Sequence, residues 1–338
     1  LAAGERYPAN GVGIMTWTGG MTSPEEYPWL GAHWSFFKRR LDEGRLAHAL
    51  MIEGPAGSGK TALASAMVAR LLCAESQDYA CGHCRSCELL SGGAHPDFFN
   101  LEPEEGSEVI KVDQIRGMIA RLDLTTSISS TKVAYIRPAE SMHPAAANAL
   151  LKSLEEPAGD AVLILVSHDA GKLPVTIRSR CQGISVSQPE QKVVLDWLAK
   201  NSSQHPDELG AALQAAGGSP LRALRYLDSP ELDAYAKVRE ALAVLLGRPA
   251  SVSVVSSQLD GLEPEDLWRW ISMCTGEIVK AQMARQPLNW LQKNVALCDK
   301  TLLQLQKQAD INRQLSATPV RGDLLLQDWL IKWAEQAV

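Results

Sequence analysis

The sequence predicts an α/β domain, with a parallel sheet covered by helices on both faces, followed by a region built only of helices. Short apolar strands alternate with helical segments between about residues 27 and 186. The first of these strands runs directly into a glycine-rich loop at residues 54–61. After Gln188-Pro189 no further strand pattern occurs. Alternating strands and helices are typical of a parallel sheet, and their end at residue 189 marks the start of the helical region.

The expected strands are short apolar runs, and the expected helices lie between them. The helix that ends before Pro157 has Pro144 in its first turn, where proline is favoured. We expect strands at 48–53, 97–101, 132–136, 161–166 and 182–186. We expect helices at 34–44, 61–72, 144–156, 191–200, 206–216 and 220–227, and helices throughout from residue 230. In the last helix, we expect one buried stripe of Leu324, Leu325, Trp329, Leu330 and Trp333.

Length and composition favour a folded protein of two or three domains. The chain has 338 residues, which is more than one ordinary core spans, and 46% of them are apolar. With a net charge of −6, the surface as a whole is not expected to bind nucleic acid, although a local basic patch is compatible with this charge. No run approaches the ~20 apolar residues of a membrane span, so we expect no membrane association and a cytoplasmic location. Residues 1–24 show no apolar period, and we expect a flexible extension there, with Met21 as a candidate start.

The glycine-rich loop predicts a phosphate site. It fits G-x-x-x-x-G-K-[ST] at every fixed position. Glycines let the backbone N–H groups turn inward around phosphate oxygens, Lys60 brings a positive charge, and Thr61 offers a hydroxyl to Mg²⁺. The positive end of the following helix points to the same place. The loop consists of Gly54, Pro55, Ala56, Gly57, Ser58, Gly59, Lys60 and Thr61.

The strand that should supply acids for hydrolysis lacks them. A hydrolysing enzyme needs one carboxylate for Mg²⁺ and a group that positions water. The strand at 132–136 is followed by Arg137 and Pro138, which can do neither. Glu140 lies beyond the strand, and we interpret it as a solvated residue at a helix start. Binding of ATP or ADP stays open, binding of Mg²⁺ stays uncertain, and hydrolysis is not expected.

Four cysteines predict a structural zinc site within residues 73–87. Their spacing is C-x₇-C-x₂-C-x₂-C, and zinc takes four thiolates in a tetrahedron that leaves no position for water. We expect His83 not to be a ligand. With Arg85 it makes the module mildly basic, which suits a DNA contact, although a solvated polar loop is the simpler interpretation. The expected ligands are Cys73, Cys81, Cys84 and Cys87.

Ser179-Arg180-Cys181 precedes the last strand and leaves two roles open for the arginine. It could pair with a carboxylate of its own chain. It could also reach a γ-phosphate in another chain, a task that suits a planar and permanently charged guanidinium. Composition does not choose between the two.

Taken together and in this order, these motifs resemble the delta-prime family of bacterial DNA polymerase III clamp-loader subunits. The resemblance rests on the phosphate loop, the four cysteines, the segment Asn148–Pro157 and the Ser-Arg-Cys motif, and it is strongest between Ala47 and Cys181. It implies an AAA+ domain at 25–187, a helical lid at 188–229 and a helical collar for oligomerisation at 230–338.

The resemblance also implies function and partners. A delta-prime subunit is the rigid member of a hetero-pentamer with motor and delta-type subunits, which loads the sliding clamp onto primer-template DNA. Its arginine acts in trans on a neighbouring ATP site, which assigns that role to Arg180. The zinc ligands of the family fall on the four cysteines. Arg222 lies one position away from the sensor arginine of motor subunits, so its role stays open.

We therefore expect a non-hydrolysing clamp-loader subunit. The main alternative is an active ATPase motor subunit of the same loader, which the Arg137-Pro138 pair disfavours. A stand-alone zinc protein that binds DNA is a third alternative, and the net charge of −6 weighs against it.

Overall fold

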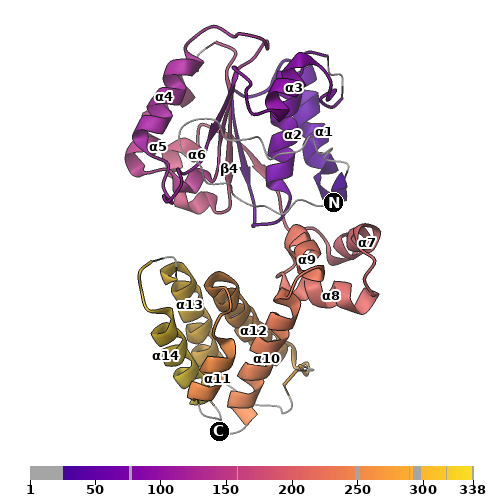
Figure 1. The fold of residues 1–338 in the computed structure, drawn as a ribbon, viewed down its shortest axis with the longest axis vertical. Coiled ribbons are helices and arrows are strands. Elements are labelled where there is room, and N and C mark those ends of the chain that lie inside the picture. The colour runs from indigo at the N-terminus through magenta and orange to yellow at the C-terminus, as the bar shows by residue number, and fades with distance from the viewer. Residues whose placement is uncertain are drawn as a thin grey trace. The chain divides into compact units, whose positions relative to one another are not determined.

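A computed structural model describes most of the chain as two compact units. The described residues are 26–75, 78–157, 159–247, 252–288, 290–291, 298–316 and 318–336. The first unit runs to Ser203 and includes Gly218–Arg222, and the second comprises Gln204–Gly217 and the chain from Ala223 onward (Figure 1). The expected extension at 1–24, with Met21, lies outside the described residues. The predicted lid and collar boundaries stay predictions.

The first unit is built on one five-stranded sheet in which every pairing is parallel. The strand order is β2-β3-β4-β1-β5, so β1 lies in the interior between β4 and β5. The strands are β1 Ala49–Glu53, β2 Phe98–Leu101, β3 Val133–Ile136, β4 Val162–Ser167 and β5 Gln182–Ser185. All five predicted strands are confirmed, with each end within one residue of its expected position.

The helices of the first unit include every predicted one and three that were not predicted from the sequence. The missed helices are α3, α4 and the short α6. In α4 the buried residues Ile115, Met118 and Leu122 are spaced as one helical face requires. The helices are α1 Gly31–Asp42, α2 Lys60–Leu72, α3 Arg85–Ser91, α4 Val112–Leu122, α5 Pro144–Glu155, α6 Val175–Arg178 and α7 Gln191–Asn201.

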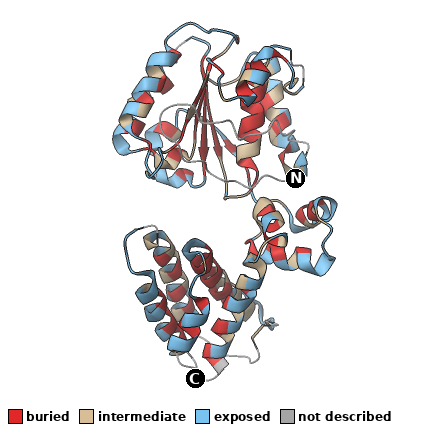
Figure 2. Cartoon of the chain, in the orientation of Figure 1, coloured by how far each residue is buried: buried red, intermediate tan, exposed pale blue. Residues whose placement is uncertain are grey.

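Both faces of the sheet are buried, so the predicted α/β fold class is confirmed. Leu50 and Ile52 of β1 pack in a core with α1 and α2. Ala49 and Met51, which alternate with them, pack in a second core with α4 and α5. Alternate residues of a strand point to opposite faces, and burial of both faces explains why the strands read as continuous apolar runs. Figure 1 shows the two helix layers, and Figure 2 shows their buried residues facing the strands.

The second unit consists of helices wherever it is described, which confirms the predicted helical region. Gly217 and Gly218 have φ values of 63° and 78° and separate α8 from α9, as expected of a helix break. The elements are α8 Pro206–Ala215, α9 Pro220–Leu227, α10 Glu231–Gly247, α11 Val252–Leu259, α12 Pro264–Ala284, α13 Asp299–Leu315 and α14 Gly322–Ala334, with the start of α9 packing in the first unit. Among the described helices, none has the length and apolar character needed to cross a membrane.

The predicted stripe of α14 is confirmed at its centre and wrong at its start. Trp329 and Trp333 are fully buried and stack with ring centroids 5.3 Å apart. The indole N–H of Trp333 donates to the carbonyl of Leu242 at 3.0 Å. Leu324 is 51% exposed, and Leu326 is buried instead, because the inward face of the helix begins two residues later.

Candidate functional site

The glycine-rich loop lies at the carboxyl edge of the sheet, where β1 ends between β4 and β5. Gly54 has no room for a side chain, because an added Cβ would lie 2.2 Å from the carbonyl oxygen of Val186. Gly57 and Gly59 have φ values of 74° and 87°, which side chains rarely adopt. The loop then enters α2 at Lys60. The predicted strand–loop–helix context of a phosphate site is therefore present.

Lys60 is buried, and groups of its own chain hold its ammonium. It is 2% exposed. Its Nζ donates to the carbonyl of Pro55 at 3.0 Å and lies 2.7 Å from Nδ1 of His168. His168 directly follows β4 and is exposed. The sequence analysis missed His168, although a polar residue just after a buried parallel strand belongs to the edge where such sheets bind ligands.

Two further segments cover the loop. The indole N–H of Trp29 donates to the carbonyl of Ser58 at 2.8 Å. The backbone N–H of Leu221 donates to the carbonyl of Gly57 at 3.3 Å, and an added Cβ at Gly57 would lie 2.0 Å from Oγ of Ser219. The segment Gly218–Arg222 therefore packs on the loop itself.

The end of β3 carries a positive charge and no acid. The guanidinium of Arg137 is paired with the carboxylate of Glu102 from the end of β2. Glu140 lies in a short 3-10 turn, where it accepts a 2.8 Å hydrogen bond from the backbone N–H of His168. Its second oxygen is buried and has no hydrogen-bond partner among the described residues. Our interpretation of Glu140 as a solvated residue is therefore wrong, because the fold brings the turn against the end of β4.

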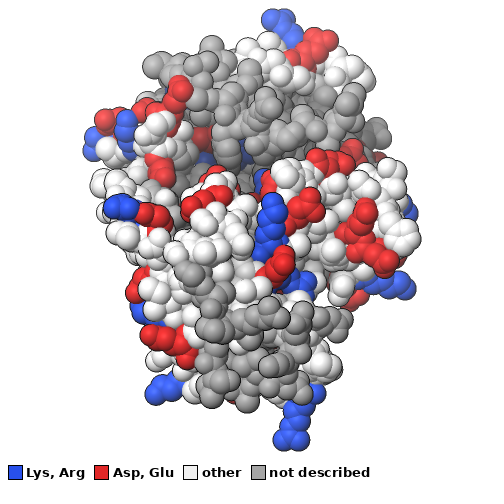
Figure 3. All heavy atoms as spheres, turned by 60° about the horizontal axis from the view of Figure 1, so that its bottom comes forward, with Lys and Arg blue, Asp and Glu red and all other residues white. Residues whose placement is uncertain are grey.

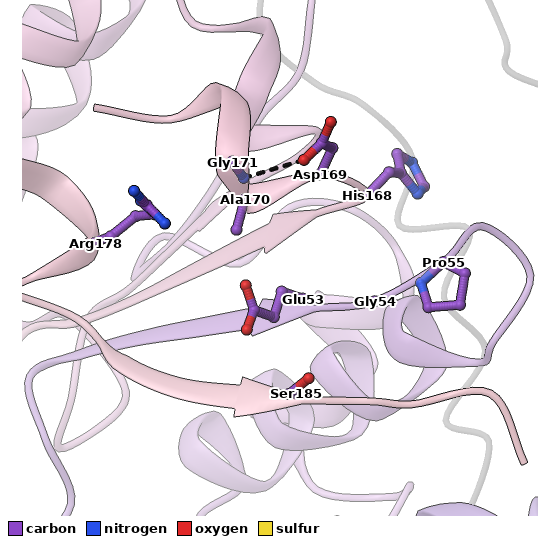
Figure 4. A pocket seen from close by; sticks show the side chains of 9 residues that line it. All are labelled: Glu53, Gly54, Pro55, His168, Asp169, Ala170, Gly171, Arg178 and Ser185. Atoms are coloured by element: carbon purple, nitrogen blue, oxygen red, sulfur yellow. Dashed lines mark hydrogen bonds between the residues drawn. The ribbon is translucent and has the colours of Figure 1, made fainter. Parts of the chain in front are cut away.

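An open pocket of about 370 Å³ adjoins the loop at the ends of β1, β4 and β5. Figure 4 shows Glu53 inside it, Arg178 of α6 to one side and His168 near Pro55. Nε of Arg178 is buried, and no described residue forms a hydrogen bond with it. The lining residues are Glu53, Gly54, Pro55, His168, Asp169, Ala170, Gly171, Arg178 and Ser185.

The four cysteines expected to bind zinc come together in one cluster. All four sulfurs lie within 4.8 Å of one another. Sγ of Cys73 is 3.9 Å from Sγ of Cys84, and Sγ of Cys81 is 4.0 Å from Sγ of Cys87. A tetrahedron with Zn–S bonds of about 2.3 Å has S···S edges of about 3.8 Å. The cluster could therefore hold one metal ion with little rearrangement.

Hydrogen bonds within the cluster favour the thiolate of Cys84, whereas burial raises the pKa of Cys73 and Cys87. The backbone N–H of Cys81 donates to Sγ of Cys73 at 3.3 Å, and the N–H of Cys84 donates to Sγ of Cys81 at 3.3 Å. Burial works to raise the pKa of Cys84, but hydrogen bonds from the backbone of Cys87 and Ala74 lower it to about 6. His83 is not one of the four clustered residues, but with Glu75 and Cys81 it forms a second group whose ligand atoms lie within 4.8 Å of one another, so its expected role as a non-ligand stays a prediction. Its Nδ1 is 3.6 Å from the carboxylate of Glu75.

A buried polar network ties the cysteine module to the sheet. The hydroxyls of Ser86 and Ser129 both donate to the carbonyl of Leu72, at 2.6 and 3.0 Å. Nε2 of His95 lies 2.7 Å from the hydroxyl of Ser86, while its Nδ1 accepts from the backbone N–H of Asp97. Because Nδ1 accepts, the proton sits on Nε2, so His95 cannot act as a base toward the serine. The network is a structural support.

Arg180 is exposed and forms an ion pair within its own chain. Its Nη2 lies 2.5 Å from Oε1 of Glu155, and its Nη1 donates to the carbonyl of Thr176 at 2.9 Å. The two charged side chains are 35% and 53% exposed. On the face drawn in Figure 3, acidic and basic side chains of the described residues are interspersed, which agrees with the modest net charge.

Comparison with known proteins places the chain in one family. The family model described as DNA polymerase III, delta subunit matches residues 30–190. The DNA polymerase III subunit delta' of Pseudomonas aeruginosa is 37% identical over 92% of this chain and 91% of that protein. The delta' subunit of Yersinia pestis is 32% identical over 91% of this chain and 95% of that protein. That of Escherichia coli is 35% identical over 64% and 65%.

The solved structure of a DNA polymerase III gamma-subunit-related protein from Thermotoga maritima has a TM-score of 0.45 and 17% identity, over 90% of this chain and 99% of that one. The relatives from Pseudomonas and Yersinia match over nearly their whole length. On this basis, the chain belongs to the family of DNA polymerase III delta' subunits.

Proposed function

We propose that this chain is a non-hydrolysing subunit of the DNA polymerase III clamp loader. It joins motor and delta-type subunits in a hetero-pentamer that places the sliding clamp on primer-template DNA. Its membership of the delta' family supports this assembly. The phosphate loop binds ATP or ADP, and the bound nucleotide is not hydrolysed.

The end of β3 is the observation that carries this proposal. A hydrolysing phosphate-loop enzyme holds Mg²⁺ there with an acid. Here Arg137 takes that position, and its charge is already paired with Glu102. Without a carboxylate at this position Mg²⁺ lacks the protein ligand that hydrolysis requires, so a bound nucleotide should remain intact.

Arg180 is the residue through which this subunit acts on a neighbour. We assign it to stabilise charge on the γ-phosphate of an ATP bound by the adjacent motor subunit. Its exposure supports this role, because a partly exposed pair with Glu155 is easily exchanged for a phosphate. One structural Zn²⁺ held by the four clustered sulfurs completes the proposal, supported by their mutual distances.

Assembly and ATPase measurements test the proposal. The purified chain should form a complex with motor and delta-type subunits and raise the clamp- and DNA-stimulated ATPase of that complex. The chain alone should not hydrolyse ATP. Failure to assemble would contradict the proposal, and so would Mg²⁺-dependent turnover by the lone chain that disappears in Lys60→Ala.

An active ATPase motor subunit is the second candidate, and the position of Glu140 favours it. This carboxylate contacts the backbone of His168, whose side chain in turn contacts Lys60. The other oxygen of Glu140 is buried and accepts no hydrogen bond from the part of the chain that the structure describes. If Glu140 held Mg²⁺, the lone chain would hydrolyse ATP and Glu140→Gln would abolish that turnover.

A further inference from the structure

The contact between Lys60 and His168 joins a buried cation to an exposed neutral base. The distance from Nζ to Nδ1 is 2.7 Å, within the range of a strong hydrogen bond. Lysine carries only donors, so Nδ1 must present its lone pair and the ring proton must sit on Nε2. The imidazole thus supplies to the ammonium the kind of electron pair that a phosphate oxygen would supply.

The backbone of His168 is held in place, whereas its side chain is exposed. Glu140 accepts the backbone N–H of His168 at 2.8 Å, which holds the residue at the end of β4. Lys60 is 2% exposed, whereas His168 is exposed. The imidazole can therefore swing into solvent without opening the core, and the lysine cannot leave the loop.

We propose that His168 is an internal competitor for the phosphate site, occupying Lys60 until a polyphosphate displaces it. This inference rests on the phosphate loop of the proposed function and adds a residue that sets its affinity. A lone pair on Nδ1 repels phosphate oxygens, so His168 gives up its contact when the ligand binds and does not join it. The ligand class is a pyrophosphate group, free or within a nucleoside diphosphate.

Calorimetric titration of the full chain with ADP, and separately with inorganic pyrophosphate, tests this at mildly alkaline pH. His168→Ala should bind both ligands about tenfold more tightly than the unaltered chain, the order of effect expected for an exposed charge-assisted hydrogen bond. His168→Asn keeps a carboxamide oxygen within reach of Lys60 and should bind like the unaltered chain. His205→Ala, an exposed histidine of the second unit, is the matched control and should change nothing.

The tighter binding expected for His168→Ala requires the ammonium of Lys60, so the double variant K60A/H168A should not show it. Unchanged or weaker binding by His168→Ala would overturn the proposal, and so would the absence of binding by both proteins. A gain for ADP without one for pyrophosphate would also overturn it, since it would place the competition at the nucleoside. Melting curves should establish that each variant is folded, and His168→Ser serves as a second truncation. Co-assembly with motor subunits does not depend on His168, so failure here leaves the assembly role intact.

Discussion

Arg180 has two candidate roles, an ion pair with Glu155 in its own chain and a contact with a γ-phosphate in a neighbouring subunit. The two roles predict free-energy effects of different size. The charged atoms are 2.5 Å apart, but the side chains are 35% and 53% exposed, so solvent screens their attraction. Exposed pairs of this kind contribute at most about 1 kcal/mol to folding. Arg180→Ala should therefore lower the melting temperature of the lone chain by no more than about 4 °C.

A role in trans predicts a much larger effect in the assembled loader. An arginine that stabilises a neighbouring γ-phosphate contributes ~10³ in rate, or about 4 kcal/mol of transition-state free energy. Arg180→Ala should leave assembly intact and lower the clamp- and DNA-stimulated ATPase of the complex, although bulk turnover averages over several sites. Arg180→Lys should restore little, because an ammonium lacks the planar fork.

Glu155→Ala is the matched control. It removes the same ion pair, so it should shift the melting temperature of the lone chain to a similar extent. It leaves the guanidinium in place, so the ATPase of the complex should stay near that of the unaltered loader. The trans role is refuted if Arg180→Ala leaves that ATPase unchanged. An equal loss in both variants would assign the effect to the ion pair instead.

Three further predictions concern the metal, the loop and the buried histidine. Elemental analysis of dialysed protein should find about one zinc per chain, and Cys84→Ser should lower that content while the second unit stays folded; absence of zinc from the unaltered protein would contradict the assignment. Gly57→Ala should destabilise the chain by about 1–3 kcal/mol in denaturant melts, because its φ is 74° and the new Cβ would lie 2.0 Å from the Ser219 hydroxyl; an unchanged midpoint would contradict the loop geometry. Burial lowers the pKa of His95, despite the nearby Asp97, so unfolding takes up a proton and stability falls as the pH drops below about 6.5. His95→Gln should remove that part of the pH dependence, and an identical profile in the variant would exclude His95 as its source.

The fold was predictable where a single local pattern decides the structure. Buried parallel strands such as Val162–Ser167 consist almost wholly of apolar residues, and prolines at 144 and 157 mark the ends of one helix. Helix α4 was missed because Arg116 and Arg121 interrupt its apolar residues, which therefore give a weaker signal than an unbroken run. A search for helical spacing in that segment would have found it.

The site was predictable only as far as its motifs are local. The residues of the phosphate loop lie close together in the sequence, and so do the four cysteines. The spacing within each motif was therefore enough to predict each site. The contact of Lys60 with His168 joins residues 108 positions apart, and the cover that Ser219 gives to Gly57 depends on a segment from beyond the sheet. Such contacts depend on the order of the strands in the sheet and on where a distant segment packs. Neither can be predicted from a local sequence pattern.

Helix α2 directly connects the two candidate ligand sites, the phosphate loop and the cysteine cluster. Lys60 begins it, and Cys73 directly follows its last residue, so about 20 Å of helix separates the loop from the sulfurs. Ten of its thirteen side chains are buried, which leaves almost no face along which it could slide or turn. Events at one end should therefore reach the other as changes in stiffness and amide protection, with no displacement of the helix. A helix held in this way would suit the proposed role of the chain as a rigid subunit.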